Sequence, residues 1–167
     1  MPKKVAPAKK ATVGKSAASQ PIKKEARSNG KKKGIDEAVE NGKSAVHYIL
    51  ILDDSYSMEG KPWKDLQAAT NEYLKALVSS REAATSKVSC VIYNSDSRIV
   101  FENEKPTYGL INKVKFEGGA TYYGPALKHA KQICDKYANE CDKFVFYFMS
   151  DGCPHDFPTA EVNQLKK

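Results

Sequence analysis

The sequence predicts an α/β domain with a mostly parallel sheet covered on both faces by helices, preceded by a basic tail. Short apolar runs bounded by polar turns, at Val46–Leu52 and Phe144–Met149, are typical of strands buried on both faces. Segments with helical periodicity separate the apolar runs, and strands that alternate with helices form parallel sheets. A change in composition near residue 43 separates the tail from the domain.

The positive charge of the chain is concentrated in residues 1–43, which hold 12 Lys and Arg against 4 Asp and Glu, a net charge of +8. Residues 44–167 hold 15 Lys and Arg against 16 Asp and Glu, a net charge of −1 within the total of +7. The tail is rich in Lys, Ala and Pro and has no aromatic residue, so we expect it to be disordered. The near-neutral domain does not favour a polyanionic partner.

The first helix is expected from Pro62 to about Val78, because proline is well tolerated at the first helical position. Its inner face is predicted from residues that recur at spacings of three, four and seven. These residues are Trp63, Leu66, Thr70, Tyr73, Leu74 and Leu77.

A hairpin is predicted next, with strands at Lys87–Tyr93 and Arg98–Phe101 joined by a turn at Asn94–Ser97. Its second strand is therefore expected to be the one antiparallel strand, at an edge of the sheet. Apolar residues within 110–114 indicate a short helix after the hairpin.

Another helix is expected to begin at Gly124-Pro125. Its inner face is formed by Leu127, Ala130, Ile133, Cys134 and Tyr137. Lys143–Met149 is then predicted as a fourth strand, which Asp151-Gly152 ends, and Thr159–Lys167 begins a further helix.

Oxygen-bearing side chains follow the ends of these segments. Asp53, Ser55 and Ser57 come directly after the first strand, Thr121 follows a glycine-rich turn, and Asp151 follows the fourth strand. In open α/β sheets, ligands bind beyond the carboxyl ends of the strands. Mg²⁺ and Mn²⁺ prefer such oxygen donors, and Mg²⁺ keeps positions open for water or for an oxygen of a ligand. The sequence therefore predicts that these five residues form a divalent metal site.

This pattern resembles the von Willebrand factor type A domain and its metal-ion-dependent adhesion site, over Val46–Pro154. The family motif, Asp-x-Ser-x-Ser followed by a Thr and a later Asp, matches the five residues above, and further matches support it. These are Met58, Gly60-Lys61-Pro62-Trp63 and Ser150-Asp151-Gly152. The resemblance implies a Rossmann-like three-layer sandwich with strand order 3-2-1-4-5-6. We therefore expect residues 44–167 to be an incomplete domain of about four strands, with the C-terminal strands missing.

The resemblance also implies a function, a metal-dependent protein-binding module that captures an Asp or Glu carboxylate of a partner protein. It implies that Ser55 and Ser57 bind the metal directly, and that Asp53, Thr121 and Asp151 bind it directly or through water. In the family, the direct ligand exchanges between the Thr and the Asp when the partner's carboxylate arrives. We expect no catalytic residues within the chain.

Two other classes of function stay open. The domain could recruit substrate for an enzyme whose catalytic domain lies beyond Lys167, since kinases and ubiquitin ligases carry such domains. The tail could bind nucleic acid weakly through its positive charge, although it lacks aromatic residues on which bases stack. Lys23-Lys24 and Lys31–Lys33 are similar to a split nuclear-import signal.

The location is predicted to be cytoplasmic, with the nucleus as the alternative, because no signal peptide or membrane-spanning run is seen. The four cysteines contain no Cys-x-x-Cys pair and are interpreted as reduced thiols. Cys153 and His155 are too few for a zinc site and are interpreted as an ordinary loop. Asp54 is interpreted as a solvated loop acid, the alternative being an acceptor for a metal-bound water. One of Tyr122 and Tyr123 is expected at the rim of the site.

Overall fold

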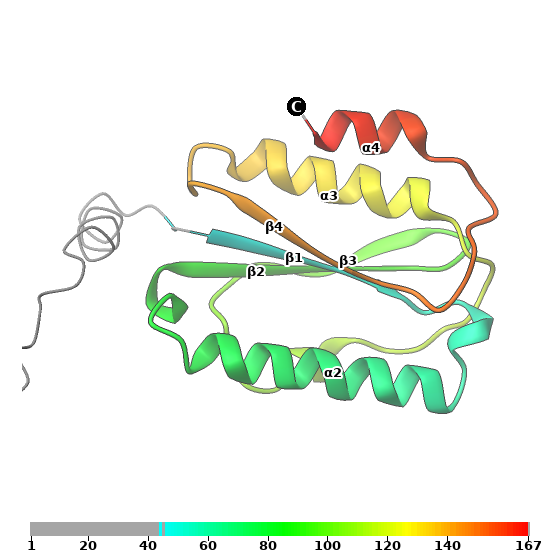
Figure 1. The fold of residues 1–167 in the computed structure, drawn as a ribbon, viewed down its shortest axis with the longest axis horizontal. Coiled ribbons are helices and arrows are strands. Elements are labelled where there is room, and N and C mark those ends of the chain that lie inside the picture. The colour runs from blue at the N-terminus through cyan, green and yellow to red at the C-terminus, as the bar shows by residue number, and fades with distance from the viewer. Residues whose placement is uncertain (1–43, 45, 167) are drawn as a thin grey trace, which may run out of the picture.

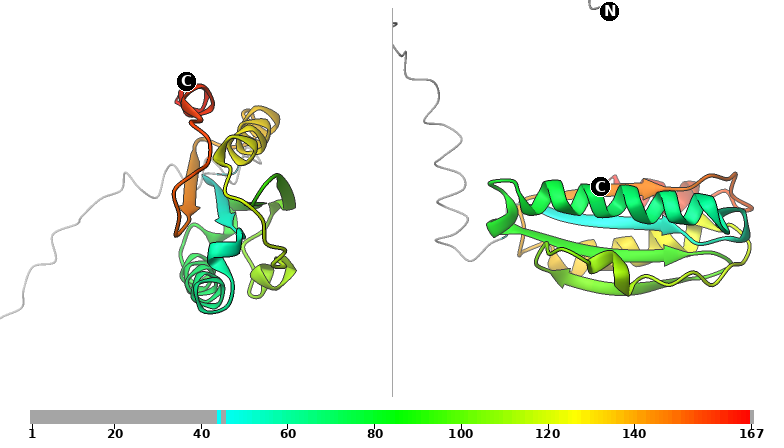
Figure 2. Two further views of the ribbon diagram at one scale, coloured as in Figure 1. Left: turned by 90° about the vertical axis from the view of Figure 1, so that its right-hand side faces the viewer. Right: turned by 90° about the horizontal axis from the view of Figure 1, so that it is seen from below.

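The chain folds into three layers, in which one long helix covers one face of a central sheet and two helices cover the other (Figure 1). The structure is a computed structural model that describes residues 44 and 46–166, so the predicted disordered tail at 1–43 lies outside it. The view along the sheet in Figure 2 shows the same layers end-on. The predicted Rossmann-like α/β sandwich is confirmed.

The sheet has four strands in the order β3-β2-β1-β4 within the described residues. β1 (Val46–Asp53) pairs in parallel with both β2 (Ser86–Tyr93) and β4 (Phe144–Met149). β3 (Ser97–Glu104) pairs antiparallel with β2 at one edge, as predicted, and extends further than expected from the apolar residues alone.

The long helix α2 (Lys61–Val78) covers one face of the sheet, together with the short 3-10 helix η3 (Leu110–Lys113). On the other face lies α3 (Tyr123–Tyr137), with α4 (Thr159–Leu165) packed against it. All four segments were predicted as helical, with boundaries that differ by one or two residues.

Alternation along β1 divides the apolar core between the two faces. Leu50 and Leu52 belong to the core beneath α2, which also contains Trp63. Ile49 and Ile51 belong to the core beneath α3. Each of these four β1 side chains is 1% exposed or less, which agrees with a strand buried on both faces.

β4 was predicted as a continuous apolar run like β1, but it is less buried than β1. Phe146 and Phe148 are each 39% exposed, because no described strand pairs with the outer side of β4. Burial here depends on the position of the strand in the sheet, which apolar composition does not determine. The two further strands implied by the family order remain a prediction.

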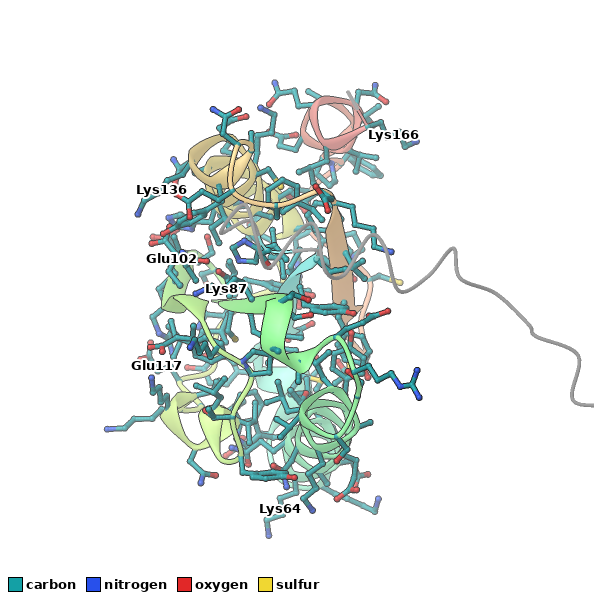
Figure 3. The ribbon with its side chains drawn as sticks, turned by 90° about the vertical axis from the view of Figure 1, so that its left-hand side faces the viewer. Lys64, Lys87, Glu102, Glu117, Lys136 and Lys166 are labelled. Atoms are coloured by element: carbon teal, nitrogen blue, oxygen red, sulfur yellow. The ribbon has the colours of Figure 1, made fainter. Side chains whose placement is uncertain are left out.

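Because β1 and β4 are parallel, their carboxyl ends lie at the same end of the sheet, at the right in Figure 1. The amino end of α3 lies at that end too. The opposite end carries charged side chains, among them Lys136 of α3, which pairs with Glu102 of β3 at 3.1 Å between Nζ and Oε1 (Figure 3).

Candidate metal centre

Four of the five predicted metal ligands form a continuous chain of hydrogen bonds. The Ser55 N–H donates to Asp53 Oδ1 at 2.8 Å, and the Oγ atoms of Ser55 and Ser57 lie 3.0 Å apart. The Ser57 hydroxyl then donates to Asp151 Oδ1 at 2.8 Å. Side chains that follow β1 and β4, almost a hundred residues apart in the sequence, therefore meet at one point.

The fifth residue, Thr121, reaches the same place from the segment that precedes α3. A Cβ atom added to Gly152 would lie 3.7 Å from Ser57 Oγ and 3.9 Å from Thr121 Oγ1. The two hydroxyls therefore both lie close to Gly152, the residue that follows Asp151. The structure thus brings all five predicted residues together.

Asp53 lies at the base of this cluster and is completely buried. Its Oδ2 accepts a hydrogen bond of 2.6 Å from the Ser150 hydroxyl, so both carboxylate oxygens have neutral donors. Within the part of the chain that the structure describes, neither Asp53 nor Asp151 forms an ion pair with a Lys, Arg or His. A buried carboxylate without a counter-ion is unfavourable, and a bound cation would compensate for it. The donor set therefore fits a hard divalent cation.

The mouth of the cluster faces solvent through Ser57 and Asp151, which are both exposed. Tyr56 is 68% exposed beside it. Tyr122 is also exposed, and its ring contacts the His155 ring in a tilted arrangement with centroids 5.6 Å apart. Tyr123 turns inward instead, and its hydroxyl donates to the Gly152 carbonyl at 2.8 Å. One of the two adjacent tyrosines therefore lies at the rim, as expected.

Asp54 is completely buried, so its interpretation as a solvated loop acid is wrong. Its Oδ2 lies 3.4 Å from a guanidinium nitrogen of Arg98, and its Oδ1 has no hydrogen-bond partner among the described residues. Burial raises the pKa of Asp54 to about 6, and the charge of Arg98 opposes this rise. Arg98 also donates to the Lys115 carbonyl at 3.1 Å and pairs with Glu117 at 2.9 Å. Asp54 is buried because Arg98 and the loop that contains Lys115 and Glu117 close over it.

Two residues to which the sequence analysis gave no role at the site hold the segment that carries Thr121. The His155 N–H donates to the Thr121 carbonyl at 2.8 Å. The Asp156 carboxylate accepts hydrogen bonds from the N–H groups of Tyr123 at 2.9 Å and Gly124 at 2.6 Å. Asp156 follows the motif by five positions in an irregular loop, and no local pattern marks it.

The described residues contain no group of three or more His, Cys, Asp and Glu side chains that could hold a metal. The candidate centre therefore depends on its hydroxyls. No helix among the described residues combines the length and the apolar character needed to cross a membrane. The predicted compartment stays a prediction.

Solved structures with the same fold include proteins of pili and of the mussel byssus. The vWF domain of the type V pili tip protein Mfa5 from Porphyromonas gingivalis has a TM-score of 0.58 at 21% identity, covering 71% of this chain and 43% of that one. The pilus adhesin SpaC from Lactobacillus rhamnosus GG, in its open conformation, has a TM-score of 0.57 at 15% identity, covering 66% and 15%. Proximal thread matrix protein 1 of the mussel byssus, with a zinc-occupied MIDAS motif, has a TM-score of 0.57 at 13% identity, covering 74% and 33%.

These identities establish the fold alone, and the chain spans less than half the length of each of these three structures. A search of curated proteins found no match. The family profile for the von Willebrand factor type A domain, in contrast, matches residues 48–153, which is more than half of the chain. The matched region begins in β1, ends just beyond Asp151 and includes all five clustered residues. The chain therefore belongs to the von Willebrand factor type A domain family.

Proposed function

We propose that the chain is a divalent-metal-dependent protein-binding module, which captures an Asp or Glu carboxylate of a partner protein. The residues that hold Mg²⁺ or Mn²⁺ are Asp53, Ser55, Ser57, Thr121 and Asp151. The observation that carries the proposal is the convergence of five oxygen-bearing side chains around two carboxylates that have no cationic partner among the described residues.

The chemistry of the donors favours Mg²⁺ or Mn²⁺. All five donors are hard oxygens, whereas zinc sites are built mostly from Cys and His. The mussel byssus protein shows that a related fold takes up zinc in its MIDAS motif. When bound, the cation supplies a Lewis-acidic position for an oxygen atom of the partner.

The buried and the exposed residues have different roles in the proposed site. Asp53 is buried and fixed by Ser55 and Ser150, so it provides negative charge at the base of the site. Ser57 and Asp151 are exposed and lie where a ligand arrives. The exposed rings of Tyr56 and Tyr122 beside this mouth offer apolar contact to residues that flank the acidic side chain.

Metal dependence is tested by titrating Mn²⁺ into the wild-type chain and into Asp53→Ala, with thermal unfolding as a second readout. A ligand that binds only the folded state stabilises it, by about 2.7 kcal/mol at a concentration of about 100 Kd. We expect Mn²⁺ to raise the unfolding temperature of the wild type and of the control Asp142→Ala, whose exposed carboxylate lies at the opposite end of the sheet. Asp53→Ala should show no such rise, and equal Mn²⁺ affinity in the two chains would overturn the proposal.

Capture of acidic groups is tested with immobilised peptides that differ only in an Asp-to-Asn exchange. Wild-type chain should bind the Asp peptides in Mn²⁺ and lose this preference in chelator. A preference that persists in chelator would mean that the carboxylate is recognised by other residues.

A further inference from the structure

We propose that Asp156 is a positioning residue that fixes Thr121 relative to Asp151, so that these two residues move as one unit. The inference rests on the proposed function, because it assigns a role to Asp156 in the affinity for metal. It concerns the segment after β4, whose contacts the family motif does not include.

Asp156 caps α3 from a distant part of the sequence. α3 begins two residues after Thr121, and Tyr122, at the capping position, makes no side-chain hydrogen bond to the helix. The Asp156 carboxylate takes this role by accepting the N–H groups of Tyr123 and Gly124 at 2.9 and 2.6 Å. A carboxylate at the amino end of a helix satisfies unpaired donors and interacts favourably with the helix dipole.

Gly124 is the residue that permits this close approach. A Cβ atom at Gly124 would lie 2.8 Å from Asp156 Oδ2, which is closer than such atoms come in proteins. The exchange Gly124→Ala therefore pushes the carboxylate away without changing any candidate ligand. It provides an independent perturbation of the same contact.

Further bonds join the two segments along their length. His155 and Thr121 are linked by their backbone, with the His155 N–H donating at 2.8 Å. Nearer to Asp151, the Tyr123 hydroxyl donates to the Gly152 carbonyl at 2.8 Å, and its oxygen lies 3.1 Å from Ser150 Oγ. Asp151 is also held by the hydrogen bond that it accepts from Ser57. Removing the Asp156 carboxylate should therefore displace chiefly Thr121.

This arrangement changes how ligand exchange operates in this chain. An exchange between Thr121 and Asp151 as independent ligands requires one segment to move relative to the other. The bonds of Asp156, His155 and Tyr123 oppose that movement. A partner's arrival would therefore shift both residues together relative to Ser55 and Ser57.

The test compares Mn²⁺ affinity in the wild type, Asp156→Ala and the control Asp142→Ala, each alone and combined with Thr121→Ala. Loss of a residue that orients a metal ligand typically weakens metal affinity about 10-fold to 100-fold, and we expect about 10-fold for Asp156→Ala. In the Thr121→Ala background the same exchange should change affinity by less than about 2-fold, because the two mutations act through one side chain. A merely structural role would lower the unfolding temperature and leave the two effects on affinity additive.

The outcomes separate the two proposals. If the wild type binds no Mn²⁺, the proposed function fails. If the wild type binds and Asp156→Ala binds equally well, only the role of Asp156 is overturned. Should Asp156→Ala not fold, Asp156→Asn and Gly124→Ala replace it, and each is expected to weaken Mn²⁺ binding. Wild-type affinity in both would overturn the inference.

Discussion

Two buried ionisable residues should give the domain opposite dependences of stability on pH. His47 in β1 is 1% exposed, and its Nε2 lies 2.8 Å from Ser89 Oγ. Burial lowers the pKa of His47 from 6.5 to about 4, an effect that Lys87 strengthens and Glu102 opposes. Both charged residues are labelled at this end of the sheet in Figure 3. Asp54, at the other end of β1, has its pKa raised from 3.8 to about 6 by burial.

The direction in which stability changes with pH depends on whether the folded or the unfolded chain binds more protons. Between pH 6.5 and about 4 the unfolded chain protonates His47 and the folded chain does not, so His47 favours folding above pH 6.5 and this stability is lost as the pH falls. Asp54 behaves in the reverse way, because the folded chain holds the proton between about pH 6 and pH 3.8. One pKa unit corresponds to about 1.4 kcal/mol, so each residue contributes about 3 kcal/mol over its range. The two contributions nearly cancel in the wild type.

The assay is urea unfolding in chelator, at pH values from about 7 to about 4.5, for the wild type, Asp54→Asn and His47→Gln. Removing Asp54 leaves His47 uncompensated, so Asp54→Asn should lose about 2 kcal/mol more than the wild type as the pH falls to about 4.5. His47→Gln should deviate in the opposite direction. Parallel stability curves for the three chains would refute the reasoning, because they would mean that neither group titrates differently in the folded state.

Two further predictions concern the loop that carries Thr121. Gly119 has a φ of +144°, and a Cβ there would lie 3.0 Å from Asn94 Cβ, so Gly119→Ala should lower the free energy of unfolding in urea by about 2 to 3 kcal/mol. Gly118→Ala, at a φ of +79° and facing only a movable side chain, should cost about 1 kcal/mol, and a reversed order would contradict this account. Arg98→Met should destabilise by about 2 kcal/mol, at the low end for a broken buried pair because Arg98 is 35% exposed. Combining it with Asp54→Asn should recover most of that loss in the same assay.

The residues that could be predicted from the sequence are those that a regular element positions. β1 and β4 are short apolar runs in parallel strands, with α2 between β1 and β2 and α3 before β4. Their carboxyl ends must then share one end of the sheet, which brings Asp53 and Asp151 close together. Ser55 and Ser57 must lie near the same end of the sheet, because they are only two and four residues after Asp53. Periodicity and topology together were therefore enough to locate these four residues. Thr121 lies in an irregular segment and was predicted from its place after a glycine-rich turn and from the family motif.

The residues that were missed depend on contacts between irregular loops. Asp54 is buried because Arg98 of β3 and the loop around Glu117 close over it. Asp156 acts on α3 from a loop more than thirty residues away. Neither contact leaves a periodic signal, since a loop residue has no fixed relation to distant elements.

The different environments of Asp53 and Asp54 support the proposal that the site binds a cation. Neighbouring side chains at the end of a strand point in opposite directions, so Asp54 reaches Arg98 while Asp53 faces the cluster. The guanidinium group offsets the charge of Asp54, but it makes no ion pair with Asp53. Hydrogen bonds from Ser55 and Ser150 hold the Asp53 carboxylate without neutralising it. Its negative charge, together with that of Asp151, is thus left for a partner that this part of the chain does not provide.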